Sequence, residues 1–457
     1  MEQLDREERM KAWNEIEKAL MQEKIDLFRA EFLELHPYDQ ARIFEEQEKN
    51  VRLLIYSYLA PQEMAEVMEQ VDSDRVVDII GEMLPEFAAK VLEEMAIDDA
   101  VDILNDLDDK NMVASFLTVM SKDASEQIKK LLHYEEKTAG SIMTTEYVVI
   151  REDMTVKEAM KHLRKEAPGA ETIYYLYVVN VDKKLVGVIS LRDLIIAEGD
   201  FLIKEVMSER VVSVPAGEDQ EEVAQMMRDY DFLALPVVDF QEHLLGIITV
   251  DDIMDVMEEE ASDDYSKLAG FSDVEKLNDT AIASAKKRLP WLIILLFLGM
   301  FTASIIGRFE ETLDQVAILA VFIPLIAGMA GNTGTQALAV AVRNLSASSS
   351  NEKINTKRII WEEAKTGVIT GTCCGILITL IVAFWYKDIY LGGLVGISIM
   401  ATLVVATIAG AFVPLVMHRL KIDPAVASGP FITTLNDIIS ILIYFSLATT
   451  FMGLLTN

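Results

Sequence analysis

The sequence predicts a multidomain membrane protein with a superhelical α-helical domain, a duplicated α/β domain and an all-α transmembrane domain of five helices. Three observations support this prediction. Residues 1–285 are rich in Asp, Glu and Lys, whereas charge nearly disappears after Leu289. The charged half contains two internal repeats of different period. The apolar half contains five segments, each long enough to cross a hydrocarbon core of about 30 Å.

The composition argues against several classes of function. A formal net charge of −33 disfavours nucleic acid, whose phosphates require a basic partner, and a polybasic membrane-surface anchor. The adjacent Cys373 and Cys374 form neither a disulfide framework nor a zinc pattern. The charged N-terminus lacks the apolar core of a signal peptide and is expected to stay in the cytoplasm. No hydrolytic or redox constellation is present, so we do not expect an enzyme.

The apolar segments and their flanks predict a membrane topology. The segments are expected at 289–308, 315–342, 364–386, 390–417 and 424–455. Basic clusters precede the first segment, separate the second from the third, and separate the fourth from the fifth: Lys286, Lys287 and Arg288; Arg343, Lys353, Lys357, Arg358 and Lys365; Arg419 and Lys421. Because cytoplasmic loops are enriched in Lys and Arg, we expect a cell-membrane protein with its N-terminus inside and its C-terminus outside.

Asp437 is the one acidic residue well inside an apolar segment. It could pair between helices or reach the interface, but its side chain is short. Intramembrane carboxylates usually line an ion or proton path, and we expect Asp437 to do so. Thr433, Thr434 and Asn436 would supply further oxygen atoms.

The second apolar segment carries Gly328, Gly331 and Gly334 at every third position. Small residues with such spacing commonly permit close helix packing. Amide and hydroxyl side chains are interleaved with them: Asn332, Thr333, Thr335 and Gln336. A backbone that opens its carbonyl groups to an ion path would account for both the glycines and the polar cluster, and we favour this interpretation.

Residues 61–120 contain a repeat of twelve or thirteen residues. Short amphipathic helices are expected to begin, in turn, at Pro61, Ser73, Pro85, Asp98 and Lys110. Stacked helices of this period predict a small superhelical solenoid. The pattern indicates an interaction or regulatory domain, expected over residues 1–137.

A second duplication covers residues 138–260. MTTEYVVIREDMTVKEAMKHL is similar to MSERVVSVPAGEDQEEVAQMM, and LYVVNVDKKLVGVISLRDLI is similar to LPVVDFQEHLLGIITVDDIM. Each copy predicts strand–helix–strand–strand–helix. This pattern resembles tandem CBS domains, expected at 138–201 and 202–264.

Each copy also carries the motif Gly-x-x-Ser/Thr-x-x-Asp. The motif residues are Gly187, Ser190 and Asp193, and then Gly246, Thr249 and Asp252. In CBS pairs the hydroxyl and carboxylate of this motif contact the phosphate and ribose of an adenine nucleotide. The same spacing is close to a capping box, in which the hydroxyl caps the following helix. Both interpretations remain open at either copy.

The acidic excess is concentrated in residues 205–264, which hold eighteen Asp or Glu against Arg210 and Arg228. Such a run is usually a solvated face. Two carboxylates about 4 Å apart repel by roughly 4 kcal/mol at an effective dielectric of 20. Packing this surface against another acidic surface would therefore require intervening cations.

Three motifs occur in the charged and apolar halves: AGNTGTQ at 330–336, DPAVASGPFITTLND at 423–437 and ETIYYLYVV at 171–179. With the order of its parts, the chain resembles the MgtE family of bacterial magnesium channels. Ala330 is a mild departure, because the family often has a glycine there. The resemblance implies a homodimer in the lipid bilayer, with one pore on the two-fold axis. It also implies a connecting or plug helix over 265–288, before a pore domain over 289–457.

The resemblance further implies which residues bind ligands. Asp437 corresponds to the pore carboxylate. The lining of the pore is expected to include Asn332, Thr333, Gln336, Thr433 and Asn436. The residues that correspond to the family's Mg²⁺-sensing positions are Asp98, Asp219, Glu221, Asp252, Glu260, Asp263 and Asp264. An ATP site corresponds to Tyr175, Arg192, Asp193 and Phe232.

These features predict a Mg²⁺ channel that closes when cytoplasmic Mg²⁺ binds between the acidic N domain and the CBS domains. Mg²⁺ prefers a few carboxylates and retained water, and a two-fold axis would bring two Asp437 carboxylates to one divalent ion. One alternative is a CBS-regulated secondary transporter of Co²⁺, Mn²⁺ or Ni²⁺, although such transporters usually show inverted repeats. Another is a membrane-anchored nucleotide sensor, which would leave Asp437 unexplained.

Overall fold

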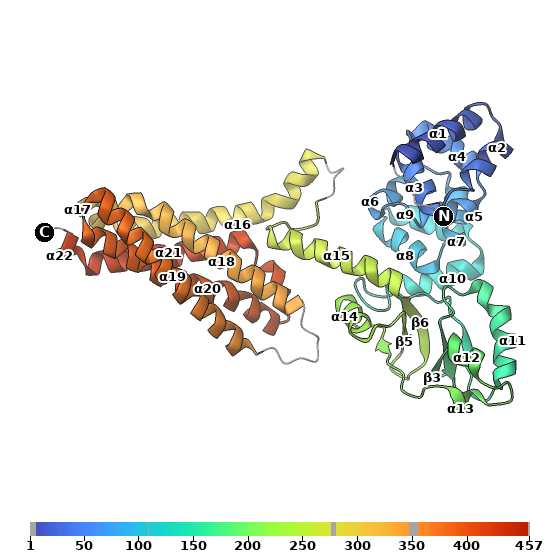
Figure 1. The fold of residues 1–457 in the computed structure, drawn as a ribbon. Coiled ribbons are helices and arrows are strands. Elements are labelled where there is room, and N and C mark those ends of the chain that lie inside the picture. The colour runs from blue at the N-terminus through green and yellow to red at the C-terminus, as the bar shows by residue number, and fades with distance from the viewer. Residues whose placement is uncertain (1–5, 108, 276–279, 347–354, 456–457) are drawn as a thin grey trace. The chain divides into compact units, whose positions relative to one another are not determined.

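The computed structural model describes residues 6–107, 109–275, 280–346 and 355–455. The chain divides into two compact units, Met1–Met257 and Glu258–Asn457, which are described in turn (Figure 1). Lys353, from the second basic cluster, lies outside the described residues.

Short helices form the N-terminal part of the first unit: α1 (Arg6–Met21), α2 (Ile25–Phe32), α3 (Pro37–Glu45), α4 (Lys49–Tyr58), α5 (Pro61–Met68), α6 (Ser73–Ile80), α7 (Pro85–Glu94), α8 (Ile97–Asp106), α9 (Lys110–Val119) and α10 (Lys122–Leu131). Pro61 and Pro85 occupy the first helical turn, where a missing backbone N–H is not needed. The predicted solenoid repeat is confirmed, with the helix expected at Asp98 beginning at Ile97.

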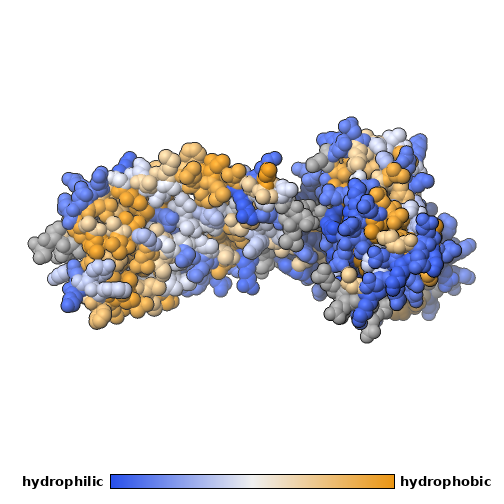
Figure 2. All heavy atoms as spheres, turned by 90° about the horizontal axis from the view of Figure 1, so that it is seen from above, coloured by the Kyte–Doolittle hydropathy of each residue, from blue (hydrophilic) through white to orange (hydrophobic). Residues whose placement is uncertain are grey.

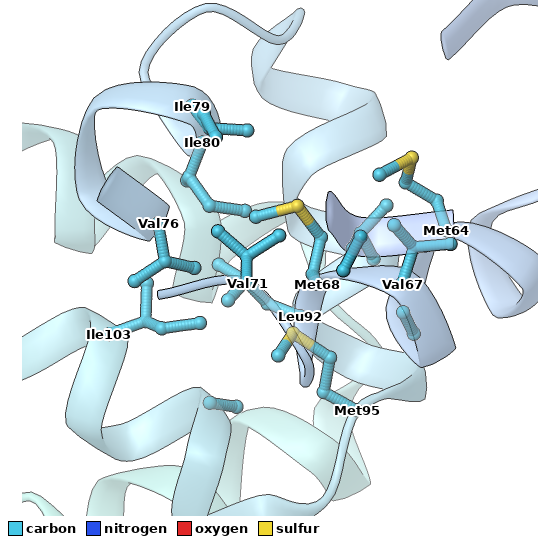
Figure 3. Packing of buried hydrophobic residues seen from close by; sticks show 14 of the residues in the cluster. Met64, Val67, Met68, Val71, Val76, Ile79, Ile80, Leu92, Met95 and Ile103 are labelled. Atoms are coloured by element: carbon cyan, nitrogen blue, oxygen red, sulfur yellow. The ribbon is translucent and has the colours of Figure 1, made fainter. Parts of the chain in front are cut away.

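The stacked helices share one apolar core. Figure 3 shows Met68 of α5, Ile80 of α6 and Leu92 of α7 within this core. Each of these side chains is almost completely buried. Because no single helix of this length is stable alone, the repeat holds together by burying these faces against its neighbours.

Two copies of one α/β fold follow. The first contains β1 (Val149–Arg151), α11 (Val156–Glu166), η1 (Ala167–Gly169), β2 (Tyr175–Val179), β3 (Leu185–Ser190) and α12 (Leu191–Ile196). After α13 (Ile203–Val206), the second contains β4 (Val214–Pro215), α14 (Gln220–Tyr230), β5 (Ala234–Val238), β6 (Leu244–Thr249) and α15 (Val250–Leu268). Each sheet has a parallel first pair and an antiparallel second pair. The predicted duplicated fold is therefore confirmed.

The connecting helix expected over 265–288 is not one helix. α15 ends at Leu268 and α16 begins at Ala281, and residues 276–279 lie outside the described part of the chain. Gly270 has φ of +84°, a conformation that ends a right-handed helix and favours glycine. The Thr280 hydroxyl then accepts a hydrogen bond from the backbone N–H of Ala283 and caps the next helix.

The second unit consists mainly of long apolar helices. Its elements are α16 (Ala281–Gly307), α17 (Glu310–Gln315), η2 (Ala317–Phe322), α18 (Ile323–Ser346), α19 (Thr356–Tyr386), α20 (Ile389–Arg419), η3 (Pro424–Val426), α21 (Gly429–Thr450) and α22 (Met452–Leu455). Among the described residues, five spans are long and apolar enough to cross a membrane. Figure 2 shows apolar surface over this unit and hydrophilic surface over much of the first. The prediction of five membrane helices is confirmed.

Candidate cation-binding and ion-path residues

Three carboxylates of the first unit form a compact group. Asp98 lies in the first turn of α8, Glu171 precedes β2, and Asp252 lies in the first turn of α15. One oxygen atom from each lies within 4.8 Å of the others. Asp98 is only 6% exposed, and among the described residues its Oδ1 atom has no hydrogen-bond partner. An array of close, buried anionic oxygens suits a hard divalent cation.

Thr249 helps to hold this group in place. It is the last residue of β6 and is 2% exposed. Its hydroxyl donates a hydrogen bond to the Asp252 carboxylate, which also accepts from the Thr249 backbone N–H at 3.2 Å. The motif expected to contact a nucleotide in the second CBS copy therefore orients a carboxylate toward Asp98 and Glu171.

Burial and mutual repulsion raise the pKa values of these acids. Burial raises the pKa of Asp98 well above its usual range, and repulsion from Asp252 adds to the effect. Burial, and then repulsion from Glu69, raises the pKa of Asp99 to about 8. Burial raises the pKa of Asp252 to about 7, against the hydrogen bond from Thr249. Burial also raises the pKa of Glu171. A carboxylate whose pKa is raised in this way is stabilised when it binds a proton or a metal cation.

The other residues predicted to sense Mg²⁺ do not belong to this group of three. Asp219 accepts a hydrogen bond from the backbone N–H of Glu221 at 2.9 Å and caps α14. Glu221 lies in the first turn of that helix. Glu260, Asp263 and Asp264 lie on the part of α15 that belongs to the second unit.

Lys267, in the same part of α15, forms two ion pairs. Its ammonium group lies 2.9 Å from Asp263 Oδ2 and 2.6 Å from Asp423 Oδ2, in the loop before α21. Burial lowers the pKa of Lys267, but the hydrogen bonds to Asp423 and Asp263 outweigh it and raise that pKa. The Lys267 ammonium group therefore links two carboxylates, Asp263 and Asp423, that are far apart in the sequence.

The first CBS copy presents its motif differently. The Ser190 hydroxyl accepts a hydrogen bond from the backbone N–H of Asp193 at 3.0 Å and donates one to the Asp193 carboxylate at 2.7 Å. Capping is thus observed at this copy. Arg192 and Asp193 are exposed, and Tyr175 pairs with Ser190 across β2 and β3.

Phe232, the remaining residue of the expected ATP site, lies between α14 and β5. Its ring stacks on that of Tyr230, with centroids 5.3 Å apart and planes inclined by 7°. The Tyr230 side chain is exposed. The pair therefore offers an aromatic surface on which a base could stack.

In the second unit, α18 is a continuous helix from Ile323 to Ser346. The interpretation that its backbone opens to a pore is therefore wrong, and close packing is found at Gly331 and Gly334, whereas a Cβ atom on Gly328 would meet no atom within 4 Å. A Cβ atom on Gly331 would lie 2.6 Å from Thr433 Cγ2, and one on Gly334 would lie 1.8 Å from Asn436 Nδ2. The two glycines leave space for polar side chains from α21.

The polar residues of α18 and α21 have different environments. Asn332 and Gln336 are exposed, and Thr333 is half-buried. Thr433 lies 3.3 Å from the Thr335 hydroxyl. Asp437 is half-buried and is the only charged residue of α21. Asn436 differs from the expected pore lining because its side chain is 1% exposed within this chain.

Comparisons with known proteins identify the family. Family models match a divalent cation transporter domain at 323–447, an MgtE intracellular N domain at 35–137, and CBS domains at 139–200 and 203–259. The magnesium transporter MgtE of Enterococcus faecalis is 54% identical over 332 residues, which are 73% of this chain and 73% of that protein. The chain belongs to the MgtE family of magnesium transporters. It is a multipass membrane protein.

Two solved structures resemble part of this MgtE family member. The soluble part of a magnesium transporter is 47% identical, with a TM-score of 0.53, and the match covers 56% of this chain and all of that one. The cytosolic domain of the Mg²⁺ channel MgtE, solved in complex with ATP, is 38% identical, with a TM-score of 0.51, and the match covers 53% and 98% of the two chains.

Glu171 and Asp99 were missed by reasoning from the MgtE sequence motifs. Glu171 begins the quoted motif ETIYYLYVV, but only the folded chain places it beside Asp98. Asp99 is adjacent to a predicted residue, and its pKa shift results from burial that the sequence does not reveal. The available signal was a pair of acids at the start of a solenoid helix, Asp98 and Asp99.

Proposed function

We propose that this protein conducts Mg²⁺ across the cell membrane as a homodimer, and that cytoplasmic Mg²⁺ closes the pore. Membership of a magnesium transporter family supports the substrate. The observation that carries the proposal of a pore is Asp437, the only charged residue of the apolar helix α21. Two such carboxylates on a two-fold axis would match one divalent ion.

The ion path would follow α18 and α21. The exposed Asn332 and Gln336 and the half-buried Thr333 supply polar groups to a partially hydrated ion. Mg²⁺ releases its water reluctantly, so a site with a few carboxylates and retained water would bind it weakly enough to let it leave. The basic flanks of the apolar helices support a cytoplasmic N-terminus and an external C-terminus.

The sensor would be the group formed by Asp98, Glu171 and Asp252. Asp98 comes from the solenoid, and the other two come from the CBS copies. Without a cation their mutual repulsion opposes the contact between these parts, and Mg²⁺ would remove that repulsion. Several weak sites, including Asp219, Glu221, Glu260, Asp263 and Asp264, acting on one two-state element would sharpen the response.

The direct test is uptake by liposomes that contain the purified protein. We expect Mg²⁺ to enter without a proton or Na⁺ gradient, and to stop entering when Mg²⁺ is high on the side of the soluble part. Strict dependence of uptake on such a gradient would favour a secondary transporter. Absence of flux for Mg²⁺, Mn²⁺, Co²⁺ and Ni²⁺ would contradict transport altogether.

The raised pKa values predict a dependence of stability on pH. The folded cytosolic unit keeps protons on Asp99 and Asp252 that the unfolded chain releases near pH 4. Its free energy of unfolding should therefore fall as the pH rises from about 4 to about 8. Without divalent cations we expect a Tm lower by about 10 °C at pH 9 than at pH 6, equivalent to roughly 4 kcal/mol. Saturating Mg²⁺ should remove the part of this difference that Asp252 contributes.

Calorimetry of the cytosolic unit at both pH values measures this effect. The double variant Asp99→Asn and Asp252→Asn is the matched comparison, because its amides do not titrate. Its Tm should change much less between pH 6 and pH 9. An equal change in variant and wild type would show that other groups cause the dependence.

ATP is proposed to bind at the motif of the first CBS copy, between Tyr175, Arg192 and Asp193 of that copy and Phe232 of the second copy. The exposed Asp193 would accept hydrogen bonds from the ribose hydroxyls, and an aromatic ring would stack on the base. A related cytosolic domain was solved with ATP, which supports the assignment. ATP would then modulate closure rather than drive transport.

Asp193→Ala should weaken ATP binding by about 1.5–3 kcal/mol, which is roughly ten- to a hundredfold in Kd. Isothermal calorimetry without Mg²⁺ measures the change. Asp252→Ala, at the equivalent position of the second copy, is the matched control, because its carboxylate faces the cation site. Equal loss in both variants, or no binding by the wild type, would contradict the assignment to the first copy.

A further inference from the structure

We propose that Asn436 is a positioning residue for the ion path: its amide occupies the space left by Gly334 and sets the direction in which Asp437 faces. The proposal deepens the function proposed above and rests on it. No contact between Asn436 and the ion is required.

The fit between Asn436 and Gly334 is close. A Cβ atom on Gly334 would lie 1.8 Å from Asn436 Nδ2 and 3.1 Å from Asn436 Cγ. A Cβ atom on Gly410 of α20 would lie 2.3 Å from the Gly334 carbonyl oxygen. α18 is therefore in close contact with both α20 and α21 at this level.

The chemistry of Asn436 is unexpected for a residue that only fills space. Its side chain is 1% exposed, and within the described residues neither Nδ2 nor Oδ1 has a hydrogen-bond partner. Burial of an amide without partners is unfavourable, so an apolar side chain would serve better if packing were the only requirement. Buried asparagines can instead fix the register between helices at a cost in stability.

The rotation of α21 about its own axis sets the direction in which the Asp437 side chain points. Successive residues of an α-helix are about 100° apart around its axis, so the direction of Asn436 determines that of Asp437. With Asn436 turned into α18, the half-buried Asp437 lies on a different face of α21. A rotation of α21 would change the spacing of the two carboxylates proposed to share an ion.

The test enlarges the residue on α18 and shortens the side chain that contacts it from α21. Gly334→Ala should reduce Mg²⁺ uptake at least about tenfold, because a misplaced site loses activity steeply. Adding Asn436→Ser should restore uptake to within about threefold of the wild type, since contacting residues are not additive. The matched pair is Gly331→Ala with Thr433→Ser. In the crossed pairs, Gly334→Ala with Thr433→Ser and Gly331→Ala with Asn436→Ser, uptake should stay low.

A second readout separates positioning from general packing. Asn436→Ser alone should assemble as the wild type does, and should show a higher KM for Mg²⁺ and a lower preference for Mg²⁺ over Co²⁺. Normal uptake by Gly334→Ala, equal rescue by the crossed pairs, or unchanged KM and preference in Asn436→Ser would each overturn the proposal. If Gly334→Ala does not assemble, Asn436→Ser alone decides. Failure of the proposed function is distinct, because it would appear as absent uptake in the wild type.

Discussion

Asp437→Ala is expected to abolish Mg²⁺ uptake while leaving a folded protein. The substitution removes the only charged side chain of α21, and the proposed shared site would then lose both of its negative charges. Uptake of Mg²⁺ by liposomes, with size-exclusion chromatography to verify assembly, measures the effect. Asp437→Glu should also impair uptake, because the added methylene group displaces the carboxylate.

A matched control is Glu311→Ala, which removes one carboxylate from the exposed surface of α17. It should conduct as the wild type does. Full conduction by Asp437→Ala would show that the ion path does not depend on this carboxylate.

Asp98→Asn together with Asp252→Asn is expected to give a protein that conducts but no longer closes at high Mg²⁺. The amides cannot bind the cation strongly, so the bridge that Mg²⁺ would form between the solenoid and the CBS copies is lost. The Mg²⁺ concentration that halves uptake should rise at least about tenfold, equivalent to about 1.4 kcal/mol. Uptake at graded Mg²⁺ on the soluble side measures the shift.

Protease digestion of residues 265–288 provides an independent measurement. In the wild type we expect Mg²⁺ to protect this segment, and in the double variant we expect little protection. Asp26→Asn with Asp123→Asn removes two exposed carboxylates and is the matched control for charge. Closure of the double variant at the same Mg²⁺ concentration as the wild type would contradict the assignment of the sensor.

The elements that follow from local sequence were predictable. The apolar segments are long and uninterrupted by charge, so the five membrane helices follow from hydropathy. The solenoid helices begin at residues that favour helix starts, such as Pro61 and Pro85. The duplicated α/β fold follows from two similar patterns of strands and helices.

The features that depend on tertiary packing were not predictable. The glycines in α18 were consistent both with an opened backbone and with a continuous, closely packed helix. The helix is continuous, and its close packing depends on Thr433 and Asn436 of another helix. The break in the connecting segment depends on Gly270, whose positive φ has no signature beyond the residue type. Glu171 joins the group of three carboxylates from a different domain, and no local pattern links it to Asp98.

Charged groups of two helices can be joined either by a dissolved ion or by a charged side chain, and Lys267 is an example of the second. An ion taken from solution occupies its site in proportion to its concentration, whereas an ammonium group on the same chain is present at every concentration and at a high effective concentration. The link from Lys267 to Asp263 and Asp423 therefore responds to ionic strength but draws on no dissolved metal. The end of α15 thus keeps this anchor to the loop before α21 whether or not a divalent cation is present.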